Sequence, residues 1–188
     1  MAEKQFKSRQ VRIPPQNIDT EKALLGALML RPEGMYEVTD VVSRDSFYVD
    51  KHRMLFDAML ELHGRHEPID MLSMSSRLKE RGKFESTGGG SYLAELVDAV
   101  PSSSNARHYA EIVQKKHVLR TLIDAAEHIS ELGYNEIDEI ETVLDEAEKK
   151  IYSITNATVT KKFVNIKETL EEAWERLDSL HKAGGQLR

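Results

Sequence analysis

The sequence contains no cysteine and no hydrophobic run long enough to cross a membrane. Without cysteine there are no disulfides or thiolate metal sites, and a reducing compartment is permitted. A membrane-spanning helix needs about 20 consecutive apolar residues. The opening sequence MAEKQFKSRQVRIPP also lacks the apolar core of a signal peptide. We therefore expect a cytoplasmic protein with no membrane contact.

Aromatic residues are scarce, at 6% of the chain, whereas hydrophobic residues reach 40% and charged residues 31%. This balance is ordinary for a globular protein, and the shortage of aromatics favours helix packing by leucine, isoleucine and alanine. A length of 188 residues suits one ordinary core or two small helical units. The composition therefore predicts an all-α fold.

Lysine and arginine are absent from residues 121–148, which hold ten acids, and the whole chain has a net charge of −6. Affinity for nucleic acid backbones comes largely from lysine and arginine, so we expect little direct DNA binding. Residues 1–13 are the exception, with four basic residues against one acid. This tail is either solvated and mobile or a minor contact for nucleic acid.

Short polar residues and prolines mark the first predicted helices. Asn17 or Asp19 caps the first helix, which Pro32 stops. A short second helix follows over 33–42. The third runs from about His52 and ends at Gly64, which suits a left-handed cap.

Two more helices complete the predicted head. A turn ending at Asp70 caps the fourth helix, and Gly82 ends it. The fifth begins after the glycines at 88–90. Phe47 and Tyr48 lie between the second and third helices, and we expect this aromatic pair to enter the core.

A long helix is predicted over 105–132, and Gly133 and a cap at Asn135 separate it from a further helix. Apolar residues step by three and four along both, which predicts an antiparallel helical hairpin. A lone hairpin cannot bury both stripes, so we expect it to pack against a second copy; the alternative is packing onto the head. The residues expected at the dimer interface are Ile112, Leu119, Ala126, Ile137, Ile140, Leu144 and Ile151.

After the hairpin, residues 155–164 are rich in threonine and show little periodicity, which is typical of a linker. A last amphipathic helix follows and has no later partner in the sequence. Its apolar face therefore docks into a partner groove or onto the chain's own body. The residues expected to dock are Ile166, Leu170, Trp174 and Leu177.

No motif for catalysis is present. A P-loop requires a lysine after its glycines, and Thr87-Gly88-Gly89-Gly90-Ser91 has none, so this segment is interpreted as a turn. The seven histidines form no metal motif, since His117 and His128 lie roughly 16 Å apart along one helix. We expect no catalytic residue, no bound metal and no cofactor in this chain.

Several short motifs occur along the chain in the same order as in a known protein family. Pro14-Pro15-Gln16-Asn17 with Glu21 and Leu25-Gly26 is similar to the opening of DnaB-type replicative helicases. The similarity continues through about residue 183 by Phe47-Tyr48, His52, Pro68-Ile69-Asp70, Gly89-Gly90, Tyr92-Leu93, Val100-Pro101-Ser102, Asn105, Tyr109-Ala110-Glu111-Ile112-Val113 and Leu144-Asp145-Glu146-Ala147-Glu148.

The resemblance implies a compact orthogonal helical head, a hairpin, and a linker helix before a RecA-like ATPase domain. That domain, with its ATP and Mg²⁺, is expected only in the full-length protein, because this sequence stops about where it should begin. The expected parts are a tail (1–13), the head (14–103), the hairpin (104–155), a linker (156–165), the linker helix (166–183) and a terminal tail (184–188).

Family membership also implies partners. Hairpins pair into dimers, three dimers form a hexameric collar, primase binds the collar, and the linker helix docks on the neighbouring subunit's ATPase domain. A helicase loader is a further expected partner. The residues expected to contact primase are Asp19, Tyr92, Ile123 and Ile129.

Two other functions remain open from the sequence. The chain is alternatively a stand-alone helical adaptor, similar to a loader, that binds the helicase or primase. The third possibility is nucleic acid binding through residues 4–12.

Overall fold

The computed structural model describes residues 13–134 and 139–159, and every regular element within these ranges is helical. The all-α prediction is confirmed. The chain divides into two units after Ile154, and of the second unit the structure describes only the end of the last helix, up to Val159. The helices are α1 (Ile18–Leu30), α2 (Gly34–Val38), η1 (Arg44–Ser46), α3 (Asp50–Gly64), α4 (Met71–Glu80), α5 (Gly89–Asp98), η2 (Ser103–Asn105), α6 (Ala106–Leu132) and α7 (Ile140–Val159).

Two of the predicted helix caps are present. The Asn17 side chain accepts a hydrogen bond from the backbone N–H of Thr20 at 3.1 Å, which begins α1. The Asp70 carboxylate accepts from the backbone N–H of Ser73 at 2.8 Å, which begins α4. Each cap satisfies a backbone donor that the first helical turn leaves unpaired. The predictions from Asn17 and Asp70 are confirmed.

The prediction that Gly64 adopts a left-handed cap is wrong. Gly64 is the last residue of α3, and His66 is the residue with positive φ, at 58°. The backbone N–H of Glu67 reaches back to the carbonyl of Leu62 at 2.9 Å, and that of His66 bonds to the carbonyl of His63 at 3.0 Å. These two bonds close a Schellman motif, which satisfies the last carbonyls and places the left-handed residue two positions later than predicted.

The second helix is shorter than predicted, because α2 covers only Gly34–Val38 of the expected 33–42. Val42 instead enters the core from the following turn, where its backbone N–H still bonds to the carbonyl of Val38. The chain then becomes extended at Ser43. Phe47 is fully buried, as predicted for the aromatic pair, whereas Tyr48 is only half-buried.

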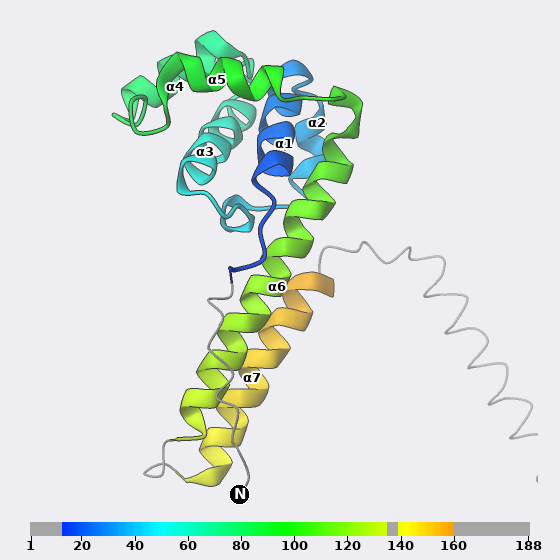
Figure 1. The fold of residues 1–188 in the computed structure, drawn as a ribbon, viewed down its shortest axis with the longest axis vertical. Coiled ribbons are helices and arrows are strands. Elements are labelled where there is room, and N and C mark those ends of the chain that lie inside the picture. Colours follow the sequence, from blue (N-terminus) through cyan, green and yellow to red (C-terminus); the bar gives the residue numbers. More distant parts are fainter. Residues whose placement is uncertain (1–12, 135–138, 160–188) are drawn as a thin grey trace, which may run out of the picture. The chain divides into compact units, whose positions relative to one another are not determined.

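Helix α1 lies at the centre of the head, which we define as residues 13–105 (Figure 1). It contacts α3, α5 and α6. Its close approach to α5 depends on Gly26, because a Cβ at this position would lie 1.9 Å from the carbonyl oxygen of Leu96. The fully buried side chains of largest volume are Phe47, Phe56, Leu24, Leu25, Leu28, Met35, Leu55, Met59, Leu62, Ile69, Met74 and Leu78.

Helix α6 belongs to two environments. Its first turns bury Ala106, Ala110 and Val113 against the head, whereas its later turns run beside α7 (Figure 1). Nε2 of His128 lies 3.2 Å from the Glu146 carboxylate, which links α6 to α7. The helical hairpin is therefore present. Helix α7 extends to Val159, four residues past the predicted end of the hairpin at 155.

Candidate partner interface

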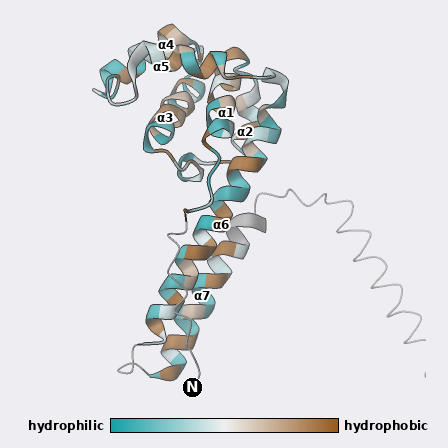
Figure 2. Ribbon diagram, in the orientation of Figure 1, coloured by the Kyte–Doolittle hydropathy of each residue, from teal (hydrophilic) through white to brown (hydrophobic). Residues whose placement is uncertain are grey.

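The hairpin carries large apolar residues that remain in solvent. They are between 38% and 66% exposed, on α6 and on α7. Figure 2 shows hydrophobic residues along both helices. In contrast, Ala125 is the one buried apolar residue of α6 after Val113. We call the exposed set the apolar hairpin surface, and it consists of Leu119, Leu122, Ile123, Ile140, Leu144, Ile151 and Tyr152.

Most residues predicted for a dimer interface lie on or beside this surface. Ile112 is half-buried near the head, and Ala126 is exposed. Ile137 lies outside the described residues, and so do the four residues predicted for linker docking, from Ile166 to Leu177. The residues that the structure places in the apolar hairpin surface are Leu119, Ile140, Leu144 and Ile151.

The four residues predicted to contact primase come from three helices. Asp19 is exposed at the start of α1, and Ile123 is 44% exposed on α6. Ile129 is half-buried on the same helix. Tyr92 on α5 is only 7% exposed, so little of its side chain is available to a partner.

The hydroxyl of Tyr92 belongs to a buried polar chain. It lies 2.7 Å from Nε2 of His52, and Nδ1 of that histidine lies 2.6 Å from the Glu21 carboxylate. In the tautomer whose Nδ1 donates to the carboxylate, Nε2 accepts the hydroxyl hydrogen. Glu21 is 2% exposed and His52 is fully buried. These three hydrogen-bonded side chains therefore join α5, α3 and α1 inside the core.

Glu21 also holds the loop before α3. Its second oxygen accepts from the backbone N–H of Tyr48 at 2.7 Å. A buried carboxylate must be fully hydrogen-bonded to be tolerated, and this one meets a backbone donor and an imidazole. The sequence held a signal for this pair, because Glu21 and His52 fall on the apolar stripes of their own helices. Both residues were nevertheless named from the sequence only as motif positions, and neither their burial nor their pairing was predicted.

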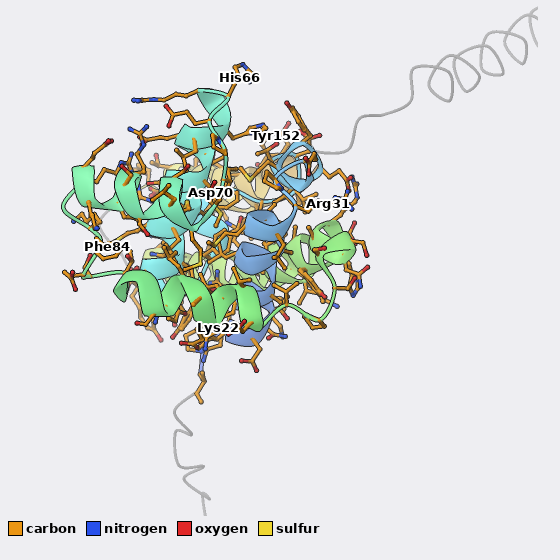
Figure 3. The ribbon with its side chains drawn as sticks, turned by 90° about the horizontal axis from the view of Figure 1, so that it is seen from above. Lys22, Arg31, His66, Asp70, Phe84 and Tyr152 are labelled. Carbon is orange, nitrogen blue, oxygen red and sulfur yellow. The ribbon has the colours of Figure 1, made fainter. Side chains whose placement is uncertain are left out.

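Two lysines lie beside the Tyr92 ring. Nζ of Lys51 is 3.3 Å from the ring centroid, and Nζ of Lys22 is 5.9 Å from it. Lys22 also bonds to Glu95 at 2.6 Å, where α1 meets α5 (Figure 3). Burial raises the pKa of the Tyr92 phenol. Hydrogen bonding by Lys22 lowers the pKa of the Glu95 carboxyl, and the same contact raises the pKa of Lys22.

Arg120 joins the head to the hairpin. One terminal nitrogen of its guanidinium donates to the carbonyl of Pro15 at 2.8 Å and the other to the carbonyl of Ser46 at 2.7 Å. The guanidinium carbon lies 5.4 Å from the ring centroid of Tyr48. Burial lowers the pKa of Arg120. Ser46 in turn donates from its hydroxyl to the Gln114 side chain at 2.8 Å, so α6 holds this loop at two points.

A groove of about 500 Å³ opens beside Arg120, between the head and α6. We call it the junction groove. Its walls combine apolar, basic and acidic side chains. They are Ile13, Pro14, Asp45, Tyr48, Arg53, His117, Arg120, Thr121, Ile123, Asp124 and Glu127.

Within the described ranges, no group of three metal-ligating side chains comes together. In the same ranges no helix combines the length and apolar character needed to cross a bilayer. The segment predicted as a turn, residues 87–91, contains Gly88 with φ of 96° directly before α5. A Cβ on Gly88 would lie 2.8 Å from that of Tyr92, so this position requires glycine on both counts.

Known proteins identify this arrangement. The family model of the DnaB-like helicase N terminal domain matches residues 13–115. The replicative DNA helicase DnaB of Geobacillus stearothermophilus is 39% identical over 176 residues, which is 94% of this chain and 39% of that protein. Replicative DNA helicase DnaC of Bacillus subtilis matches to the same extent. This chain therefore spans about two fifths of the length of these relatives.

Solved structures agree with the sequence relatives. The N-terminal domain of DnaB helicase from Mycobacterium tuberculosis superposes with a TM-score of 0.72 at 34% identity, covering 75% of this chain and 99% of that one. A DnaB-like replicative helicase, described with its interactions with primase, shares the fold with a TM-score of 0.64 at 24% identity, covering 87% of this chain and 35% of that one. The resemblance drawn from the sequence is confirmed, and the chain belongs to the family of DnaB-like helicase N-terminal domains.

Proposed function

We propose that this chain is the collar region of a bacterial replicative DNA helicase, which assembles subunits through its hairpin and recruits primase in the cytoplasm. The observation that carries this proposal is the apolar hairpin surface, whose residues are up to 66% exposed. Groups of exposed large apolar side chains of this kind are typical of protein interfaces. ATP-driven unwinding belongs to the full-length protein, because this sequence has no P-loop.

The occupant we propose for this surface, apart from Ile123, which we assign to primase below, is the hairpin of a second copy. Two hairpins facing each other form four helices around a shared apolar core, and a twofold axis lets the same residues meet from both sides. By family resemblance, three such dimers form the hexameric collar. The linker helix, through Ile166 to Leu177, then docks on the neighbouring subunit's ATPase domain, and a helicase loader is a further partner.

Primase is the second proposed partner. A DnaB-like replicative helicase and the N-terminal domain of DnaB helicase from Helicobacter pylori are each described with their interactions with primase. On this chain we assign the direct contact to Asp19, Ile123 and Ile129. Because Tyr92 is buried, we assign it a positioning role through His52 and Glu21.

Light scattering tests self-association. The 188-residue chain should have a mass of two or more chains at micromolar concentration, and Leu144→Lys should shift it toward a single chain because a charge then enters the shared core. Thr142→Lys is the matched control. Thr142 is also exposed and lies roughly 200° around α7 from Leu144. A monomeric parent chain, or equal effects of the two lysines, would contradict the proposed interface.

Calorimetric titration with the helicase-binding domain of a primase tests recruitment. Ile123→Lys should weaken binding by about tenfold or more, since central interface truncations often exceed 1 kcal/mol. The control is Leu72→Lys, which changes an exposed apolar residue on α4. An absence of heat with the parent chain would remove primase from the proposal and leave self-association standing.

A further inference from the structure

The junction groove has an electrostatic imbalance that the proposed function does not use. Its arginines already donate to the protein, since Arg120 bonds to two backbone carbonyls and Arg53 to the Phe47 carbonyl and the Asp50 carboxylate. Its acids, Asp45, Asp124 and Glu127, are exposed. Among the described residues none of these three carboxylates makes a hydrogen bond or ion pair. Arg53 is thus paired with Asp50, whereas the carbonyls that Arg120 meets are neutral and its charge remains near Asp124. Counting histidine as neutral, three carboxylates share the groove with this one unpaired guanidinium, so the excess charge is negative.

The chain enters the groove at its own N-terminal end. Ile13 and Pro14 line the groove, and the hydrogen bond from Arg120 to the Pro15 carbonyl fixes the chain against α6 at this point. Figure 1 shows the segment before α1 running from the head to the side of α6. Ile13, the first described residue, therefore lies at the groove.

The preceding segment has the complementary charge. Residues 1–12 contain one acid, Glu3, and four basic residues, Lys4, Lys7, Arg9 and Arg12. We propose that residues 1–12 occupy the junction groove of their own chain, with their basic side chains against Asp45, Asp124 and Glu127. Ile123 also lines this groove, so a segment seated there would cover part of the face that we assign to primase, and trapping of the segment is therefore measured without primase.

The dimensions are compatible with this occupant. The groove residues of α6 extend from His117 to Glu127, which is roughly 15 Å along a helix. Twelve extended residues reach about 40 Å, so fewer than half of them cover the helix face. The covalent attachment at Ile13 gives the segment an effective concentration near the millimolar range. Weak ion pairs are then sufficient to fill the groove in cis, whereas a separate molecule would have to compete with the tethered segment.

Disulfide trapping locates the segment, and the absence of native cysteine makes each introduced pair unique. We design Ser8→Cys with Glu127→Cys in the 188-residue chain. The matched control is Ser8→Cys with Lys115→Cys, because Lys115 is exposed and points to the opposite side of α6 from the groove. Mild oxidation should form the intramolecular link at position 127 at least several times faster than at position 115.

The disulfide-linked products show whether the groove is filled by residues 1–12 of the same chain or of another copy. Equal rates at the two positions would overturn the proposal, because they would show a segment with no preferred place. A disulfide-linked dimer as the main product would also overturn it, since the segment would then occupy the groove of another copy. High salt should slow the link at 127, because the contact is largely ionic.

Tryptic cleavage after Arg9 gives an independent readout without new cysteines. In Asp124→Asn with Glu127→Gln, cleavage should accelerate roughly 2- to 30-fold, the change expected from losing two partly screened ion pairs of about 0.2 to 1 kcal/mol each. Asp98→Asn with Glu141→Gln removes the same charge from exposed positions outside the groove and should leave the rate unchanged. An unchanged rate in the groove variant would contradict the proposal.

Discussion

The head and the hairpin use similar amphipathic helices but hide their apolar side chains to different degrees. In the head, Leu25, Leu28 and Phe56 are fully buried, and α1 is buried along most of its length. In the hairpin, Leu144 is 61% exposed and Ile140 66% exposed. The head can be stable as one chain. The hairpin leaves these apolar side chains in solvent, and this difference is why we propose that a second copy covers them.

Substitution in the buried hydrogen-bonded group of Glu21, His52 and Tyr92 should give the largest difference in stability loss between the head and the hairpin. Glu21→Ala should lower the free energy of unfolding by about 3 to 5 kcal/mol, because His52 and the backbone N–H of Tyr48 lose their charged partner inside the core. Urea denaturation followed by circular dichroism measures this. Glu146→Ala, which breaks the exposed pair with His128 in the hairpin, is the control and should change stability by less than about 1 kcal/mol.

Leucine truncation compares the regions directly. Leu28→Ala should cost about 2 to 5 kcal/mol of unfolding free energy, because it leaves a cavity in a packed core. Leu144→Ala should cost less than about 0.5 kcal/mol when the protein is dilute enough to be monomeric. If both substitutions cost the same at that dilution, the hairpin is already covered within one chain.

Two glycines of the head differ in how tightly their surroundings are packed. Gly26→Ala should destabilise the head by about 1 to 3 kcal/mol, because its Cβ would collide with the Leu96 carbonyl and push α1 away from α5. Gly64→Ala meets no atom within 4 Å and should be stabilising by about 0.4 to 1 kcal/mol. Thermal unfolding of both variants shows whether each substitution lowers or raises stability. A destabilising Gly64→Ala would show that this helix end needs glycine after all.

The smallest effect concerns pH. Lys22 lowers the pKa of Glu95 in the folded protein, so this contact adds stability above the ordinary pKa of glutamate and loses it as the pH falls through the lowered value. Glu95 is exposed and Lys22 only half-buried, so the change is small. Between neutral pH and about pH 3, Lys22→Met should lose less stability than the parent chain. If the free energy of unfolding falls equally with decreasing pH in the two proteins, the pair contributes nothing to stability.

Local signals explain how much of the fold could be predicted. Asn17 and Asp70 cap helices because their side chains reach a backbone donor three residues away, which sequence spacing shows directly. The apolar stripes likewise fixed the order of helices. The end of α3 was harder, since a glycine preferred for the left-handed position stayed helical and His66 took that role.

The interface and its supports depend on pairings that spacing does not contain. Glu21 meets His52 across 31 positions, and Arg120 meets the Pro15 carbonyl across 105. A polar residue on an apolar stripe signals that some partner exists, but the packing of α1, α3 and α5 decides which one. Tyr92 shows the same limit, because only its burial distinguishes a core residue from a surface contact.

The joint made by Arg120 has a consequence for how the protein can diverge. Both of its acceptors are main-chain oxygens, which every amino acid supplies whatever its side chain. Replacements at positions 15 and 46 that keep the local backbone path leave those oxygens in place. The surface around the joint can therefore change its chemistry to suit new partners while the angle between head and hairpin is inherited unchanged.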